Sequence, residues 1–226
     1  MNKLLKTIPG FLLLVFTFQS LHAQEHPPFY DDIQQFKKKD SAGFPQASAI
    51  LFVGSSSFTK WIDVQSYFPG YTIINRGFGG STLPDVIRYA DDIIFPYHPR
   101  QVVIYCGEND FEEGDSVTVQ TVFARIKQLF QLIRSKMPGE NIVYISLKPS
   151  PSRAGRMPKQ EEANTLAKNF LSTQTNASFV DVFHKMLGKD GKPMPGIFLE
   201  DSLHMNAKGY AIWQKAIEPY LLKDKK

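Results

Sequence analysis

Serine, aspartate and histidine side chains occur in this sequence at positions that suit acyl transfer. Three consecutive serines, residues 55–57, follow the apolar run 50–53 and a glycine. Near the other end of the chain, Asp201 and His204 are separated by two residues, so they can share one tight loop. A serine hydroxyl becomes a useful nucleophile when a histidine accepts its proton and a carboxylate orients that histidine. We therefore predict a Ser–His–Asp arrangement.

Two further loops carry groups that can stabilise the oxyanion of such a reaction. Residues 75–82 are rich in glycine, and residues 107–110 read Gly-Glu-Asn-Asp. Gly80 offers a backbone N–H and Asn109 offers a side-chain amide, and the loss of one such donor typically slows a reaction by about 10²–10³-fold. We expect glycine at position 80 because a side chain there would block close approach of the backbone.

Alternating strands and helices are predicted to bring these loops together. Strands are expected at residues 49–53, 71–75, 101–106, 141–147 and 178–182. Helices are expected at residues 31–39, 83–93 (capped by Thr82), 117–137, 159–173 and 207–222, with a short helix or loop at 63–67. The strand runs are almost continuously apolar, which indicates a parallel sheet covered on both faces. Ligands bind at the carboxyl ends of the strands in such sheets, where three of the four loops begin.

The four loops resemble the motifs of the SGNH, or GDSL-type, hydrolase family. Residues 54–57 stand where the family has Gly-Asp-Ser-Leu, and Trp61 follows the first glycine by seven residues, as in many members. Residues 75–82 resemble the second block, residues 107–110 match the third block, Gly-x-Asn-Asp, and residues 201–204 match the last, Asp-x-x-His. Each motif alone is weak, but all four in this order are specific.

The resemblance implies a role for each candidate residue. Ser56 is the nucleophile in this register, and Asp201 and His204 complete the catalytic triad. The oxyanion hole would be formed by the backbone N–H groups of Ser56 and Gly80 and by the side-chain amide of Asn109.

The resemblance runs from about residue 50 to residue 213 and also implies the fold and the activity. The expected fold is α/β, a three-layer α/β/α sandwich with a five-stranded parallel sheet in flavodoxin-like strand order. The implied activity is hydrolysis of a carboxylic ester through an acyl-enzyme, with no metal or organic cofactor. Exported bacterial members resemble carbohydrate esterases, so we expect a short acyl group, especially acetyl, on a small-molecule or carbohydrate substrate. A lysophospholipase or lipase-like acylhydrolase is the alternative.

Two positions depart from the family motif. Ser55 replaces the Asp of Gly-Asp-Ser-Leu, and Ser57 replaces its aliphatic residue. The Asp is not the nucleophile, so the chemistry of Ser56 does not depend on it. Ser55 nevertheless leaves open a second hypothesis, a non-catalytic ligand-binding module of the same fold.

The first 23 residues are predicted to be a signal peptide. Lys3 and Lys6 precede the mostly apolar stretch 11–18, and residues 21–23 resemble a cleavage site before Gln24. The apolar stretch is too short to span a bilayer, so cleavage would leave no stable membrane anchor. We expect an exported protein, periplasmic or secreted, with a polar segment at residues 24–47 and one SGNH hydrolase domain at residues 48–226.

Charge and cysteine content disfavour several other classes of protein. The net charge is +4, and about +2 without Lys3 and Lys6, with no concentrated basic patch of the kind that binds nucleic acid. The single cysteine, Cys106, cannot form an internal disulfide and is expected to be a small core residue. Nothing in the sequence fixes an oligomeric state.

The same residues also admit simpler interpretations. Ser56 could cap a helix, residues 77–80 could hold a phosphate, and Asp201 with His204 could bind a metal, although a third ligand at suitable spacing is lacking. His184 is the main competitor for the role of base. Residues 148–153 follow the fourth strand and could line the site, although a solvated loop is the interpretation we favour.

Overall fold

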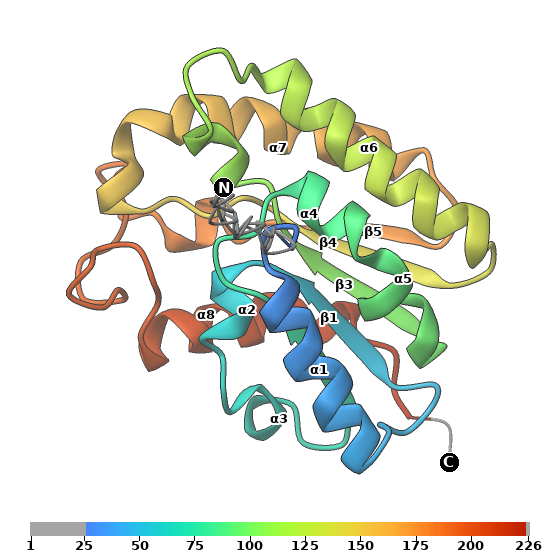
Figure 1. Cartoon of the computed structure of the whole chain (residues 1–226). Helices are drawn as coiled ribbons and strands as arrows, with labels where there is room; N and C mark the ends of the chain where they lie inside the picture. The colour runs from blue at the N-terminus through green and yellow to red at the C-terminus, as the bar shows by residue number, and fades with distance from the viewer. Residues whose placement is uncertain (1–25, 225–226) are drawn as a thin grey trace, which may run out of the picture.

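The computed structural model describes residues 26–224, so the expected signal peptide, residues 1–23, lies outside the described residues. In this part of the chain, five parallel strands form one sheet in the order β2-β1-β3-β4-β5 (Figure 1). The strands are β1 Ile50–Gly54, β2 Ile73–Gly77, β3 Gln101–Tyr105, β4 Asn141–Ile145 and β5 Ala177–Val180. The predicted flavodoxin-like strand order is confirmed.

Helices cover both faces of the sheet (Figure 1). Successive strand residues point to opposite faces: Leu51 packs in the core cluster shared with α1, α4, α5, α6 and α7, whereas Phe52 packs in the cluster shared with α2, α3 and α8. The helices are α1 Tyr30–Ala42, α2 Ser56–Thr59, α3 Val64–Tyr67, α4 Leu83–Arg88, α5 Ala90–Ile93, α6 Val119–Lys136, α7 Met157–Ser172 and α8 Ala207–Ile217. The three-layer α/β/α prediction is therefore confirmed.

Short 3₁₀ helices lie between the main elements. They are η1 Phe95–Tyr97, η2 Asn109–Glu112, η3 Pro151–Arg156, η4 His184–Met186 and η5 Glu218–Tyr220. Two of them, η2 and η3, follow the loops after β3 and β4 and contribute side chains to the candidate site.

Most predicted elements differ from the observed ones by three residues or fewer at their ends, and two helices differ more. The helix expected at 83–93 is two helices, because Tyr89 leaves helical geometry (φ −98°, ψ 10°) with its ring against Phe78 and its hydroxyl donating to the Pro28 carbonyl. The last helix ends at Ile217 rather than residue 222, since Pro219 has no N–H with which to continue it. The segment between the fourth predicted strand and the helix expected at 159–173 contains η3, and α7 begins two residues earlier than expected.

The N-terminal polar segment is attached to the domain through α1. Ile33 is buried in the core and Phe36 packs against it, as the sequence predicts for residues 31–39. Asp40 forms an ion pair with the nearly buried Arg76, whose Nε donates to the Tyr97 hydroxyl at 2.7 Å.

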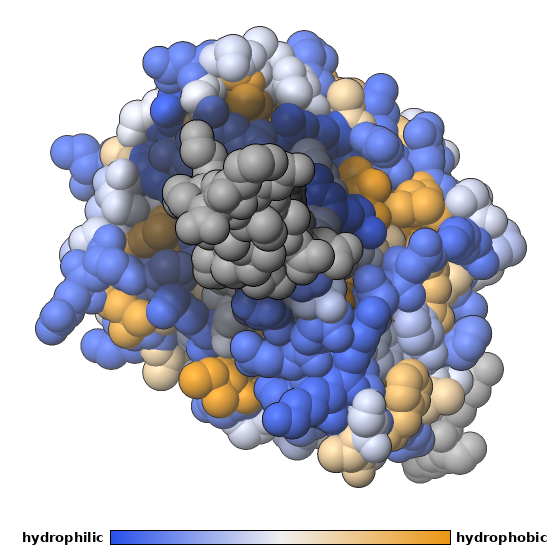
Figure 2. All heavy atoms as spheres, viewed as in Figure 1, coloured by the Kyte–Doolittle hydropathy of each residue, from blue (hydrophilic) through white to orange (hydrophobic). Residues whose placement is uncertain are grey.

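The face of the molecule drawn in Figure 2 is mainly polar where it is coloured. In the view of Figure 2, hydrophobic side chains form separate spots among hydrophilic ones. Within residues 26–224, no helix combines the length and hydropathy that a membrane span requires.

The strand register brings together three of the four candidate loops at the carboxyl ends of β1, β2 and β3. Gly54, the last residue of β1, pairs with Gly77 on β2 and with Tyr105 on β3. The loops after these three strands therefore start at the same level and lie side by side.

Candidate active site

Ser56 is the first residue of α2, directly beyond the end of β1. The chain turns there at Gly54, which has φ 144° and lies so close to β3 that a Cβ would sit 1.9 Å from the Tyr105 carbonyl oxygen. Ser55, the residue that replaces the family Asp, is buried; its N–H donates to the same oxygen at 3.0 Å, and its carbonyl accepts from the Phe58 N–H at 2.9 Å. Backbone hydrogen bonds thus hold the loop that presents Ser56.

Asp201 and His204 form a compact unit in the loop before α8. The Asp201 Oδ2 lies 2.6 Å from the His204 Nδ1, and its Oδ1 accepts the backbone N–H groups of Leu203 (3.0 Å) and His204 (2.9 Å). The hydrogen bond from the His204 side chain holds the pKa of the Asp201 carboxyl well below its ordinary value. Ser202 lies between them with φ 53°, a left-handed conformation that lets the loop close in two residues.

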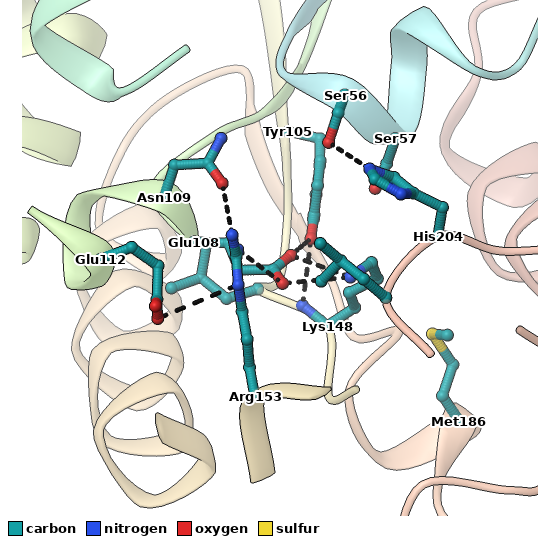
Figure 3. Close-up of polar contacts among 12 residues, drawn as sticks. Ser56, Ser57, Tyr105, Glu108, Asn109, Glu112, Lys148, Arg153, Met186 and His204 are labelled. Atoms are coloured by element: carbon teal, nitrogen blue, oxygen red, sulfur yellow. Dashed lines mark hydrogen bonds and ion pairs between the residues drawn. The ribbon is translucent and has the colours of Figure 1, made fainter. Parts of the chain in front are cut away.

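The loop of Asp201 and His204 meets the loop of Ser56. The His204 Nε2 lies 3.0 Å from the Ser56 Oγ, with the ring facing the hydroxyl as Figure 3 shows. The Asn206 side chain accepts the N–H groups of Lys208 and Gly209 as the cap of α8, so His204 is not used for capping. The structure brings all three predicted triad side chains within hydrogen-bonding distance, and their catalytic roles stay predictions.

The glycine-rich loop lies beside Ser56. A Cβ added at Gly79 would be 4.0 Å from the Ser56 Cβ. At Gly80, the described atoms that a Cβ would meet belong to the ring of Phe29, at ordinary contact distances from 3.7 Å. The expectation that a side chain here would block approach to the reacting group stays a prediction. The reason for glycine is its φ of 84°, which other residues adopt only with strain.

Asn109 is tied to the same group of loops. Its Nδ2 donates to the Ser81 carbonyl at 3.0 Å, and the Ser81 hydroxyl donates to the Gly54 carbonyl at 3.3 Å. The next residue, Asp110, has a structural role: it accepts the Leu83 N–H and pairs with Arg125 at 2.7 Å. The hydrogen bond to Ser81 therefore ties the side-chain amide of Asn109, which follows β3, to the loop after β2.

The preferred interpretation of residues 148–153 as a solvated loop is wrong at several positions. Lys148 and Ser150 are buried. Arg153 donates from Nη2 to the Asn109 Oδ1 at 3.0 Å, and from Nη1 it pairs with the Glu108 Oε1 at 3.0 Å (Figure 3). Ser152 donates its N–H to the Ser202 carbonyl at 3.1 Å, so this segment contacts both the triad loop and Asn109.

Glu108 and Lys148 form a buried ion pair beneath Asn109. The Lys148 Nζ lies 3.0 and 3.1 Å from the two Glu108 oxygens, and the Tyr105 hydroxyl also donates to Glu108. Burial opposes the charge of Glu108, yet Lys148 and Arg153 outweigh it and lower its pKa. The sequence contained a signal for this pair, because opposite charges directly follow two adjacent predicted strands.

A hollow opens beside Arg153. It has a volume of about 230 Å³ and is lined by polar residues with one glycine, which are Glu112, Ser152, Arg153, Gly155 and Arg156. Through the contacts of residues 152 and 153, this hollow adjoins both the triad loop and Asn109.

The competing assignments find less support. His184 lies 2.7 Å from Asp181 and 3.3 Å from Glu161, so these carboxylates, not Ser56, are its partners. Cys106 is buried, as predicted. Among residues 26–224, no group of three or more histidine, cysteine, aspartate or glutamate side chains is arranged to hold a metal ion.

Known proteins share this sequence pattern and this fold. Residues 53–212 match the model of the GDSL-like Lipase/Acylhydrolase family. Platelet-activating factor acetylhydrolase IB subunit alpha2 of Homo sapiens is 27% identical over 174 residues, which are 72% of this chain and 71% of the relative. A GDSL-like lipase of Bacteroides thetaiotaomicron superposes with a TM-score of 0.68 at 20% identity, over 83% of this chain and 95% of its own.

Another structure with the same fold is Axe2, an acetylxylan esterase from Geobacillus stearothermophilus, solved as a catalytic mutant. It superposes with a TM-score of 0.60 at 16% identity, over 80% of this chain and 96% of its own. The family match spans well over half of the sequence and includes Ser56, Gly80, Asn109, Asp201 and His204. The chain belongs to the GDSL-like lipase/acylhydrolase family, and it is a hydrolase that acts on ester bonds.

Proposed function

We propose that the protein is a serine esterase that forms an acyl-enzyme on Ser56. The observation that carries this proposal is the continuous contact from the Ser56 Oγ to the His204 Nε2 (3.0 Å) and from the His204 Nδ1 to Asp201 (2.6 Å). Through these two hydrogen bonds, the Ser56 proton passes to His204 as the hydroxyl oxygen attacks the acyl carbon, and Asp201 stabilises the imidazolium that forms.

The remaining steps follow from the same groups. The Ser56 and Gly80 N–H groups and the Asn109 amide are the proposed donors to the oxyanion. His204 then gives its proton to the leaving alcohol, and a water molecule deprotonated by His204 hydrolyses the acyl-enzyme. The reaction needs no metal or organic cofactor.

An acetyl group is the proposed acyl part of the substrate. An acetylhydrolase and an acetylxylan esterase are among the similar proteins, and both names specify acetyl esters. A carbohydrate is the proposed alcohol part, which suits the polar hollow beside Arg153. A phospholipid is the second candidate, because the similar acetylhydrolase is named for platelet-activating factor.

The test compares p-nitrophenyl acetate hydrolysis by the wild type, Ser56→Ala and Ser57→Ala. Ser57 is a buried neighbour in α2 and serves as the matched control. Ser56→Ala is expected to abolish turnover, whereas Ser57→Ala keeps most of it. Activity that survives in Ser56→Ala would refute the assignment of the nucleophile, and an inactive wild type would favour a ligand-binding module.

A panel of p-nitrophenyl esters with two to sixteen acyl carbons, together with acetylated xylo-oligosaccharides and lysophospholipids, tests the substrate class. The highest kcat/KM is expected for acetyl esters. A preference for long chains would instead favour the lysophospholipase alternative.

Export is proposed from residues 1–23 alone. Mass spectrometry of the protein from its native host checks this proposal, with Gln24 expected as the first residue of the processed chain. A chain that retains Lys3 and Lys6 would contradict cleavage.

A further inference from the structure

The side-chain amide of Asn109 is held at both of its ends. Its Nδ2 donates one hydrogen to the Ser81 carbonyl at 3.0 Å. Its Oδ1 accepts from the Arg153 Nη2 at 3.0 Å. A guanidinium has hydrogen-bond donors but no acceptor, so a flip of the amide by 180° would place its NH₂ donor against the Arg153 donors. This arrangement leaves the second Nδ2 hydrogen for an oxyanion.

Arg153 is itself held in place by a buried carboxylate. Its Nη1 lies 3.0 Å from the Glu108 Oε1, and only 16% of its side chain is exposed. Glu108 in turn is held by Lys148 and by the Tyr105 hydroxyl, and its side chain is 4% exposed. The guanidinium is therefore fixed by a group that does not depend on Asn109 (Figure 3).

We propose that Arg153 is a positioning residue for the oxyanion hole and acts through the Asn109 amide. This inference rests on the proposed function, because it assumes that Asn109 donates to the oxyanion. Arg153 fixes which end of the amide faces the reacting carbonyl, and its positive charge on Oδ1 polarises the carboxamide so that the Nδ2 hydrogens become stronger donors. Lysine cannot replace it, because a single ammonium group lacks the planar fork that reaches Glu108 and Asn109 together.

The test is a double-mutant cycle on the hydrolysis of p-nitrophenyl acetate, which lacks the carbohydrate proposed for the hollow beside Arg153. Arg153→Met is expected to lower kcat by about 10–100-fold with little change in KM, because a donor displaced by about 1 Å can cost 10²-fold. Asn109→Ala is expected to lower kcat by about 10²–10³-fold. If Arg153 acts only through Asn109, adding Arg153→Met to Asn109→Ala causes no further loss.

Arg134→Met is the matched control. Arg134 also makes several hydrogen bonds, which go to the carbonyls of Pro138, Glu140, Thr175 and Asn176. These carbonyls precede β4 and β5, at the amino ends of the strands and away from the site. It is expected to alter stability without altering kcat. Thermal unfolding of each variant shows whether a loss of activity follows from a loss of fold.

Three results would overturn the proposal. The first is that Arg153→Met has the same kcat as the control Arg134→Met. The second is that the losses in kcat of Arg153→Met and Asn109→Ala multiply in the double variant. The third is a raised KM at unchanged kcat, which would make Arg153 a substrate-binding residue.

A readout without substrate separates this inference from the proposed function. The side-chain amide ¹⁵N–¹H signals of Asn109 are expected to shift in Arg153→Met and to stay in place in Arg134→Met. An inactive wild type with this shift would refute the esterase proposal while supporting the positioning role. Unshifted signals would refute the positioning role whatever the activity.

Discussion

The two members of the buried ion pair should differ in their contribution to stability. Glu108→Leu would leave the Lys148 ammonium in a site that is 1% exposed, where the Glu108 carboxylate is the acceptor it contacts. Removing one partner of a buried pair typically costs about 3–5 kcal/mol. Lys148→Met should cost less, about 1–3 kcal/mol, because Glu108 keeps its contacts with Arg153 and the Tyr105 hydroxyl.

Urea unfolding of the two single variants and of the double variant measures this difference. The double variant is expected to be more stable than Glu108→Leu alone, since no ammonium is left without an acceptor. Burial already lowers the pKa of Lys148. Glu108 opposes this shift, so its removal should lower the pKa of Lys148 further. The unfolded state of Glu108→Leu then exceeds its folded state in bound protons by more than in the wild type, so the deficit should shrink as the pH rises from 7 towards 10. A Lys148→Met variant no more stable than Glu108→Leu would refute this reasoning.

Two other positions give sharp expectations. Gly54→Ala should prevent folding or lower the free energy of unfolding by more than about 4 kcal/mol, because the added Cβ would lie 1.9 Å from the Tyr105 carbonyl oxygen. Gly139→Ala is the control, since its added Cβ would meet no atom of the described residues within 4 Å. It should be nearly neutral in urea unfolding. Asp201→Asn should lower kcat by about 10⁴-fold, and wild-type-like turnover would contradict the role of His204. Because the pKa of Asp201 is lowered in the folded state, its stabilising effect should be complete above about pH 4 and should fall as the pH drops further, so the unfolding curves of wild type and Asp201→Asn should converge in acid.

The fold was predictable because four of the five strands, β1, β3, β4 and β5, are short and mostly apolar runs that are followed within two residues by a glycine or a polar residue. Leu51 and Phe52 both had to be buried, which indicated helices on both faces of the sheet. The proximity of Asp201 and His204 was predictable for a different reason, since their spacing lets one loop hold both. Their contact with Ser56 requires the loop before α8 to reach the carboxyl end of β1, and the register of β1, β2 and β3 does not by itself determine this contact.

Other features depend on contacts that no local pattern encodes. The break at Tyr89 reflects a hydrogen bond to Pro28, a residue far away in the sequence. Lys148 and Arg153 lie in a stretch whose proline, serine and basic residues are typical of a solvated loop, but Glu108, in the loop after the adjacent strand β3, supplies a buried counter-charge. Charged residues after neighbouring parallel strands can therefore be partners, even when each one alone is typical of the surface.

The junction between residues 152 and 153 limits how this segment can change in length. The N–H of Ser152 contacts the loop that carries Asp201 and His204, and the very next side chain contacts Asn109. Two consecutive residues thus connect the loop that carries Asp201 and His204 to the Asn109 amide. An insertion or deletion at this junction would change the spacing between these two contacts. Substitutions at exposed positions such as Gly155 would leave that spacing intact. Engineering of substrate range at this hollow should therefore vary side chains and keep the chain length.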